Sequence, residues 1–157
     1  MNNPVHTHFG NQVRVRACGI CLQADKILLA NHQGVVPGNF WAPPGGGIQF
    51  NETAQQCILR EFEEETGLQV TIKDFLFSCE LIRNPLHAIE LFFQVEVAGG
   101  SLKLGRDPEM GNHQIISGLK YFSRVEIKAM PEEELHGIFK IVQNPAKIVD
   151  LRGYFKL

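Results

Sequence analysis

Apolar and polar residues alternate at the start of the chain in a way that predicts β-structure. In residues 13–22, arginines alternate with valines before an apolar run, which is the two-residue period of a strand. Residues 26–30 form a second short apolar run, and the segment between the two runs is short enough for a tight turn. The Gly- and Pro-rich stretch 36–47 that follows predicts a loop with a short strand embedded around Trp41.

The rest of the chain combines strand-like runs with two helical segments. The predicted elements are a helix over residues 54–66, strands over 69–82 and 88–98 joined by a turn at Asn84-Pro85, a strand over 119–123, a helical turn over 126–130, a helix over 131–142 and an ambiguous C-terminal segment over 146–157. The later helix is predicted because Pro131 suits a first helical position and acidic residues 132–134 suit a first turn. Strands around one central and one late helix predict an α/β fold with a mixed sheet packed between helices.

Composition places the chain among ordinary globular proteins. Its 157 residues predict a single domain over 1–157, with residues 1–11 expected to be loosely ordered. Hydrophobic residues make up 44% and charged residues 20%, which excludes disordered and collagen-like classes. No apolar run approaches the roughly 20 residues that span a bilayer, and residues 1–11 lack the features of a secretory signal. The formal net charge of -2 gives no overall attraction to nucleic acid or to an anionic membrane, so neither is an expected partner.

The cysteines predict a reducing environment rather than a disulfide framework, and we therefore expect a cytoplasmic protein. Cys18 and Cys21 form a C-x-x-C pair, which can be a redox pair or half of a zinc site. No second pair of this kind or close histidine pair completes a tetrahedral set, and alternation along a strand sends the two side chains to opposite faces. Buried free thiols are the expected outcome.

The predicted helix over residues 54–66 carries an unusual group of acidic residues. Thr53 and Gln56 form a capping box at its start, and Gly67 lies where a C-terminal glycine is expected. At about 100° per residue, an apolar stripe lies beside an arc of carboxylates. The stripe is Ala54, Ile58 and Phe62, and the arc is Glu61, Glu64 and Glu65.

These three glutamates repel one another. Like charges three or four residues apart are unfavourable, and both partial burial and the negative end of the helix dipole increase the cost. A divalent cation among them would remove the repulsion, and ligands that are all oxygen atoms select Mg²⁺ or Mn²⁺. The alternative for such a cluster, taken alone, is a solvated acidic helix face.

The residues before the helix make the acidic cluster part of a longer motif. Residues 43–47, Pro-Pro-Gly-Gly-Gly, form a loop in which the backbone can approach a ligand closely. The pattern G-x5-E-x7-R-E-U-x-E-E-x-G-U, where U is a bulky apolar residue, is filled at Gly46, Glu52, Arg60, Glu61, Phe62, Glu64, Glu65, Gly67 and Leu68. Over these 23 residues the chain resembles the Nudix hydrolase family. The order of strands and helices resembles a Nudix domain across nearly the whole chain.

The resemblance implies a fold, a reaction and a set of site residues. The fold would be an α/β/α sandwich with a mixed sheet, and a homodimer would be the expected assembly. The reaction would be hydrolysis of a phosphoanhydride bond in a nucleoside diphosphate linked to another moiety, with a nucleotide sugar, an ADP-ribose-like compound or an NTP as the small-molecule partner. Metal ligands for Mg²⁺ or Mn²⁺ would be Glu61, Glu64, Glu65 and the carbonyl of Gly46, and the catalytic set would also include Arg60 and Glu52, which orient the helix.

Two positions within the motif differ from many family members. Gln49 stands where Glu is common, and Asn51 stands where Gly is common. Asn tolerates left-handed backbone angles better than most residues, so Asn51 can replace Gly. The missing carboxylate at Gln49 leaves the number of metal ions open.

Residues outside the motif supply weaker candidates for the substrate site. Arg14, Arg16 and Arg83 would add positive charge to a phosphate pocket, and Glu109 in the loop 106–112 would be the carboxylate that takes a proton from the attacking water. The alternatives are solvent-facing strand residues and a solvated loop acid. Trp41, Phe93 and Tyr121 would either stack on a base or belong to the core, and His87 is undecided.

Three other interpretations compete with a Nudix enzyme. A non-catalytic module that binds a nucleotide metabolite is disfavoured because the motif is intact. An RNA 5′-end pyrophosphohydrolase is disfavoured because the chain lacks the extended basic surface that RNA binding needs. A structural protein with an incidental acidic helix is disfavoured by the number of matched positions.

Overall fold

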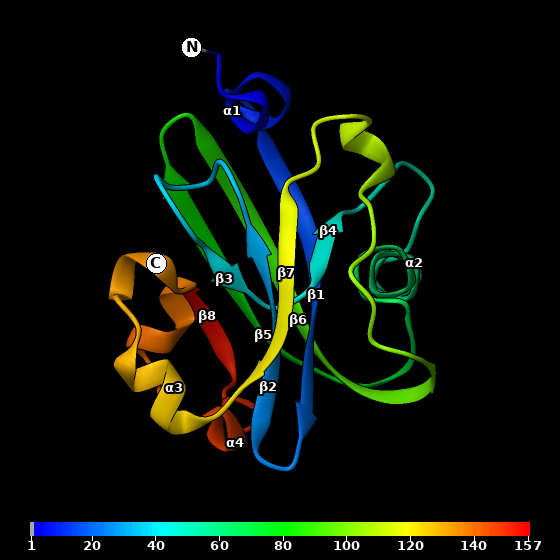
Figure 1. Cartoon of the computed structure of the whole chain (residues 1–157), viewed down its shortest axis with the longest axis vertical. Helices are drawn as coiled ribbons and strands as arrows, with labels where there is room; N and C mark the ends of the chain where they lie inside the picture. The colour runs from blue at the N-terminus through cyan, green and yellow to red at the C-terminus, as the bar shows by residue number, and fades with distance from the viewer. Residues whose placement is uncertain (1) are drawn as a thin grey trace.

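The strand-like runs pair into one mixed sheet, which a computed structural model describes over residues 2–157 (Figure 1). The strands are β1 (Val13–Gln23), β2 (Lys26–His32), β3 (Trp41–Ala42), β4 (Gly45–Gly47), β5 (Leu68–Arg83), β6 (Leu86–Gly100), β7 (Ile116–Phe122) and β8 (Gly153–Lys156). Their order is β3-β2-β1-β6-β5-β8, with β4 paired to β1 and β7 to β2. The pairs β1–β6 and β5–β8 are parallel and the others antiparallel, so the predicted mixed sheet is confirmed.

Helices cover both faces of this sheet. They are α1 (Pro4–Phe9), α2 (Ala54–Thr66), α3 (Arg124–Ala129) and α4 (Pro145–Ile148), with three 3-10 helices, η1 (Pro108–Met110), η2 (Glu132–Glu134) and η3 (Gly137–Lys140). In Figure 1, α2 lies on one side of the sheet, and α3 and α4 lie on the other. The predicted α/β/α arrangement is therefore confirmed. No helix among residues 2–157 combines the length and apolar character needed to cross a bilayer.

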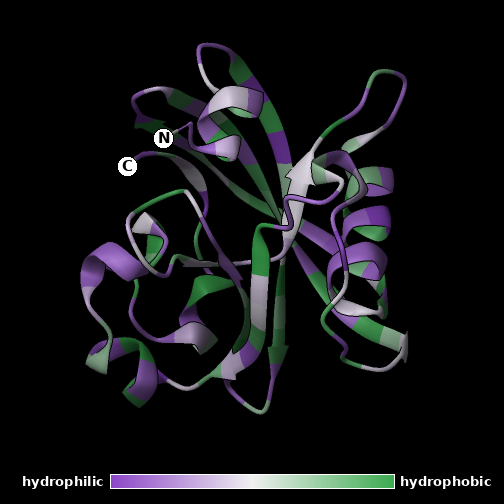
Figure 2. Ribbon diagram, turned by 45° about the horizontal axis from the view of Figure 1, so that its top comes forward, coloured by the Kyte–Doolittle hydropathy of each residue, from purple (hydrophilic) through white to green (hydrophobic). Residues whose placement is uncertain are grey.

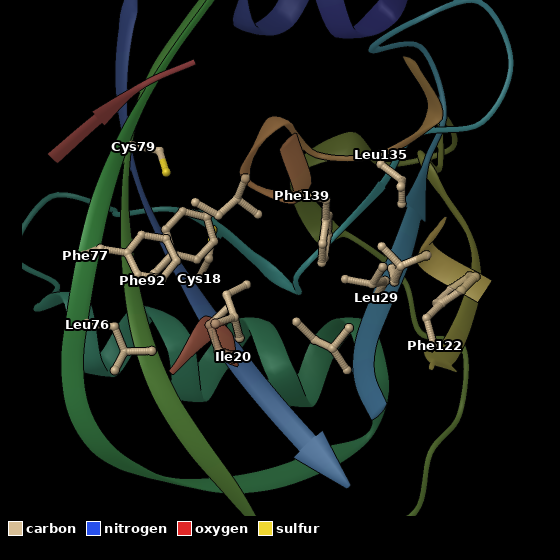
Figure 3. Packing of buried hydrophobic residues seen from close by; sticks show 14 residues of the cluster. Cys18, Ile20, Leu29, Leu76, Phe77, Cys79, Phe92, Phe122, Leu135 and Phe139 are labelled. Carbon is tan, nitrogen blue, oxygen red and sulfur yellow. The ribbon is translucent and has the colours of Figure 1, made fainter. Parts of the chain in front are cut away.

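The alternation of side chains along the strands divides the core into two parts. On the face toward α3 and α4, the rings of Phe77 and Phe92 stack with centroids 4.7 Å apart, as Figure 3 shows. On the face toward α2, Phe62 of the helix packs fully buried among strand residues. Cys18 belongs to the first part and Cys21 to the second, and both are buried free thiols, as the alternation predicts.

The predicted helix over residues 131–142 does not form, and this prediction was wrong. Between η2 and η3 the backbone is extended at Leu135 and His136, and both residues are buried. The backbone N–H of His136 donates to the carbonyl of Trp41 at 2.9 Å, and Leu135 forms a bridge with Trp41. Tertiary pairing to the short strand β3 therefore overrides the local helix signals.

The N-terminal segment differs from its sequence-based expectation, and the structure assigns elements to the C-terminal segment, which the sequence left ambiguous. The segment 1–11, expected to be loosely ordered, contains α1, and Val5 and Phe9 on this helix are buried. The ambiguous C-terminal segment forms α4 and then β8, which adds to the edge of the sheet beside β5.

Candidate active site

Helix α2 has clear boundaries, and these fix the direction of its side chains. Thr53 accepts a hydrogen bond from the backbone of Gln56, whose side chain accepts one from the backbone of Thr53, so the predicted capping box is present. Gly67 ends the helix with φ 71°, a left-handed angle that favours glycine. Hydrophobic and hydrophilic residues are interleaved along α2, as an amphipathic helix requires (Figure 2).

The glycine-rich strand β4 lies directly against the acidic side of α2. It pairs antiparallel with β1, so that Gly46 lies opposite Ala17 in the sheet. A Cβ atom at Gly46 would overlap the carboxylate of Glu61, so glycine is required for this close approach. The backbone N–H of Gly45 donates to Glu65 Oε2 at 3.1 Å. The backbone of the glycine loop is thus in direct contact with two of the three predicted glutamates.

Two of the three predicted glutamates are almost fully enclosed. The exposed fraction is 5% for Glu61 and 3% for Glu65. Burial raises the pKa of Glu61 to about 7, although the neighbouring Arg60 opposes this shift. Burial, and then the charge of Glu61, raises the pKa of Glu65 well above its usual range. These carboxylates lack sufficient positive charge around them, which is the condition that a bound cation relieves.

Arg60 organises the remaining acids of the motif. Its Nε and Nη2 atoms donate to the two oxygens of Glu52 at 2.7 and 3.0 Å, so the two residues form a bidentate ion pair. Its Nη1 atom donates to Glu61 Oε1 at 2.7 Å and to Glu64 Oε2 at 3.2 Å. Glu63 projects away from this cluster and is exposed, as its position on the helix predicts.

The chemistry of this cluster fits a hard divalent cation. Carboxylates and backbone carbonyls are oxygen ligands of the kind that Mg²⁺ and Mn²⁺ prefer, and the Gly46 carbonyl here accepts from Cys57 Sγ at 3.5 Å. In residues 2–157, however, no three acidic, histidine or cysteine side chains surround a common point ready to hold a metal ion. Arg60 Nη1 contacts both Glu61 and Glu64, and this one positive charge is shared with Glu52 as well. Metal binding by both residues would therefore require Glu64 to turn away from Arg60.

A cavity opens in front of the buried glutamates, and we call it the acidic cavity. Its lining includes the backbone of Gly45–Gly47 and the carboxylates of Glu61, Glu65, Asp107 and Glu109. Arg14 and Arg16 line the same cavity, so the structure brings these two predicted cations to the acidic residues. Carboxylates and guanidinium groups therefore line the same cavity. A phosphate bound together with a metal ion requires this arrangement, because the metal pairs with the carboxylates and the phosphate with the guanidinium groups.

The three predicted substrate arginines have different surroundings. The Arg14 guanidinium lies 3.7 Å from the centre of the Phe9 ring, and burial followed by the nearby Arg16 lowers its pKa to about 10, so it is charged at neutral pH. Arg16 donates to Glu90 Oε2 at 2.7 Å and to the carbonyl of Gly45 at 3.1 Å. Arg83 lines a separate cavity beside η2, so the structure does not bring it to the acidic cavity.

The loop after β6 contributes the predicted Glu109 and one acid that sequence reasoning missed. Glu109 lines the acidic cavity and accepts a hydrogen bond from Gln49 Nε2 at 3.2 Å. Asp107 also lines the cavity, caps η1 through the backbone of Glu109, and has a pKa raised by burial. The signal for Asp107 was its place before Pro108, a typical start of a short helix.

The aromatic candidates for base stacking belong to the strands. Trp41 packs against Phe122 with ring centroids 4.9 Å apart, and Phe93 packs against Phe75 at 5.3 Å. Tyr121 lies 3.7 Å, oxygen to sulfur, from Cys21 on the α2 side of the sheet. None of Trp41, Phe93 and Tyr121 is among the residues that line the acidic cavity.

The close approach of Gly46 leads to a first prediction. In Gly46→Ala, the added Cβ should displace the Glu61 carboxylate, and we expect kcat/KM to fall about 100-fold because a small misplacement of a catalytic group is costly. The control is Gly99→Ala, in which the Cβ meets the end of the flexible Gln69 side chain at 3.0 Å. Initial rates and melting temperatures should be measured for both variants. Unchanged activity in Gly46→Ala would contradict the role given to this contact.

Comparison with known proteins identifies the family of this arrangement. Residues 11–145 match the NUDIX domain family. An ADP-ribose pyrophosphatase of Methanocaldococcus jannaschii is 36% identical over 91 residues, which cover 57% of this chain and 54% of that protein. The match thus spans about half the length of this curated relative.

Solved structures show the same fold. A MutT NUDIX hydrolase from Burkholderia pseudomallei superposes with a TM-score of 0.66 at 21% identity, covering 84% of this chain and 96% of that one. A UDP-X diphosphatase superposes with a TM-score of 0.67 at 20% identity, covering 92% of this chain and 67% of that one. The family match over residues 11–145 includes the whole acidic motif and the strands that position it. The chain therefore belongs to the Nudix family.

Proposed function

We propose that the protein hydrolyses a phosphoanhydride bond in a nucleoside diphosphate linked to another moiety, with Mg²⁺ or Mn²⁺ as its cofactor. The observation that carries the proposal is the acidic cavity, where buried Glu61 and Glu65 face Arg14 and Arg16. A polyphosphate alone would be repelled by these carboxylates, whereas a phosphate accompanied by a divalent cation matches both sets of charges.

The metal ligands in this proposal come from helix α2 and from the glycine loop. Glu61, Glu64, Glu65 and the carbonyl of Gly46 would hold the cation. When bound, the cation neutralises phosphate oxygens and lowers the pKa of water for attack on phosphorus.

The other residues of the cavity bind, orient and accept a proton. Arg14 contributes a guanidinium to the phosphate oxygens, because none of the ion pairs formed within residues 2–157 uses its charge. Glu52 holds Arg60, which in turn holds Glu61 in position. Asp107 and Glu109 line the same cavity, and either carboxylate would take the proton from the attacking water.

A substrate panel tests the proposal. The panel contains nucleotide sugars, ADP-ribose, dinucleoside polyphosphates and NTPs, each with Mg²⁺, with Mn²⁺ and with a chelator. We expect cleavage between phosphates for at least one compound, and loss of that cleavage with the chelator. Products should be identified by mass spectrometry, so that the position of the cleaved bond is known.

Metal binding should be measured in addition to cleavage. A cation that binds only the folded protein raises the melting temperature with concentration. Tight binding of a nucleotide without any product would favour a non-catalytic binding module. No response to either metal, together with no cleavage, would overturn the proposal.

A further inference from the structure

A second cavity adjoins the acidic one, and we call it the apolar cavity. Its walls are largely hydrophobic and include Val5, Phe40, Ala42, Leu81, Leu86 and Ala88. Five residues line both cavities and therefore form the neck between them: Phe9, Arg14, Arg16, His32 and Ile115. A molecule whose phosphates lie in the acidic cavity would extend through this neck into an apolar space.

Helix α1 covers part of the apolar cavity and is held firmly in place. Val5 and Phe9 pack against Met110, with Leu86 and Ile115 beside them. Asn3 donates from its side chain to the carbonyl of Gly34 at 2.8 Å, which ties the start of the helix to the loop after β2. Helix α1 is thus packed into the fold, and it joins the N-terminal segment to the loop containing η1.

His32 in the neck has one ring nitrogen without a partner. The side chain is 5% exposed, and its Nδ1 lies 3.1 Å from the carbonyl oxygen of Ala30. A carbonyl oxygen only accepts, so Nδ1 carries the proton and donates it. Burial, reinforced by the charge of Arg16, lowers the pKa of His32 to about 3, so the ring is neutral. Nε2 is therefore an unprotonated acceptor without a partner in residues 2–157, and it has less than 1 Å² of exposed surface, so a ligand pairs with it only after a side chain of the neck moves.

We propose that His32 is a specificity-determining residue whose Nε2 accepts a hydrogen bond from a hydroxyl or amino group on the organic part of the substrate, next to the phosphates. The apolar cavity beyond the neck receives the rest of that organic group. This inference rests on the proposed function for the identity of the ligand, a nucleoside diphosphate derivative. It adds the chemistry by which one such derivative is chosen over another.

The physical reason is the cost of leaving a buried acceptor unpaired. A substrate that supplies a hydroxyl or amino hydrogen satisfies Nε2, whereas an analogue without that hydrogen leaves the acceptor desolvated and unpaired. Sites that hydrogen-bond a substrate group discriminate strongly against analogues that lack it. Sugar hydroxyls and base amino groups are the hydrogen-bond donors on the organic part of a nucleotide.

The test compares substrates that differ by one donor. The best compound of the substrate panel is paired with analogues that lack one sugar hydroxyl or one base amino group, and kcat/KM is measured for the wild type and His32→Phe. For the wild type, we expect kcat/KM for one analogue to be lower than for the parent compound by a factor on the order of 10 to 100. In His32→Phe, kcat/KM for the parent compound should fall to a similar level, while kcat/KM for that analogue should fall little further. His32→Gln, which keeps an acceptor, should restore part of the preference.

His87→Phe is the matched control. His87 lines the apolar cavity, but its Nε2 already pairs with Glu80 at 2.7 Å, so any loss should be equal for all analogues. Melting temperatures show whether each variant is folded. If His32→Phe lowered kcat/KM equally for all analogues, or did not lower it at all, His32 would not determine specificity.

Equilibrium binding separates this proposal from the proposed function. Calorimetry measures the affinity of the same compounds for the wild type and His32→Phe, with Mg²⁺ present. If the wild type cleaves none of the panel, the proposed hydrolysis fails, while binding still decides the role of His32. A weaker affinity in His32→Phe, confined to compounds with the donor, supports it, and equal affinities overturn it.

Discussion

Glu64→Gln is expected to reduce turnover by about 1,000-fold or more while the protein stays folded. The substitution keeps the shape of the side chain and removes the charge that the proposed metal site needs. Glu64 is 27% exposed in its side chain, and Arg60 at 3.2 Å is its only ion-pair partner within residues 2–157. Since Arg60 keeps its bidentate contact with Glu52, the loss of this weaker contact should change the free energy of unfolding little.

Glu63→Gln is the matched control for this experiment. It makes the same chemical change on the same helix, but Glu63 is exposed and, within residues 2–157, has no ion pair with Arg60, whereas Glu64 has one. Initial rates on the best panel compound, circular dichroism and the melting temperature should be measured for both variants. Activity of Glu64→Gln within about twofold of the wild type would remove Glu64 from the mechanism.

The acidic helix was the most predictable part of the molecule. The capping box at Thr53, the terminal Gly67 and the 3.6-residue period fix the direction of Glu61 and Glu65 without any long-range contact. The spacing from Gly46 then places the glycine loop beside the helix, and the structure has this arrangement. Local rules suffice here because each signal acts within a few residues of the next.

The segment after α3 and the N-terminal helix α1 were harder to predict for a common reason. Helix signals at Pro131 and in the acidic residues after it are local, whereas the extended backbone at His136 depends on pairing with Trp41 far away in the sequence. The burial of Val5 in α1 likewise depends on contacts with distant parts of the chain. Patterns of period two or 3.6 contain no information about such partners.

The polar residues that sequence reasoning missed are buried within apolar runs. Glu90 lies in the middle of β6 and His32 at the end of β2, and neither belongs to the acidic motif or to the predicted substrate residues. Their roles depend on which groups face them across the sheet, which requires the strand order. The sheet order places β6 beside β1, and so brings Glu90 to Arg16, its direct partner in the parallel register.

Glu90→Gln is expected to lower the free energy of unfolding by about 3 kcal/mol at neutral pH, because it leaves the partly buried Arg16 guanidinium without its buried counter-charge. Glu90 is 1% exposed, and its two oxygens accept from Arg16 Nη1 at 2.7 Å and from His136 Nε2 at 2.8 Å. His136 Nδ1 accepts from the backbone of Ile138 at 3.2 Å, so Nε2 carries the proton that is donated. Removing the carboxylate weakens the link between the late segment, the sheet and the glycine loop.

The pH dependence of this effect has a definite sign. Burial alone would raise the pKa of Glu90, but the contacts with His136 and Arg16 outweigh it and lower the pKa to about 2. Because the folded pKa lies below the usual value of about 4.5, the carboxylate stabilises the fold above pH 4.5, and this contribution disappears as the pH falls toward 2. The difference in unfolding free energy between the wild type and Glu90→Gln should therefore shrink between pH 6 and pH 3.

Urea unfolding at several pH values measures this difference, with Glu96→Gln as the control. Glu96 lies on the same strand but is 59% exposed in its side chain and pairs with Lys73 at 2.9 Å, so its loss should cost less than about 0.5 kcal/mol. A gap that stays constant from pH 6 to pH 3 would contradict the assignment of the effect to the ionised carboxylate. The Glu90 ion pair also connects to the site. Arg16, which Glu90 binds, donates to the carbonyl of Gly45, and the N–H of Gly45 donates to Glu65. Glu90→Gln should therefore also weaken Mg²⁺ binding, even at temperatures where the variant is fully folded.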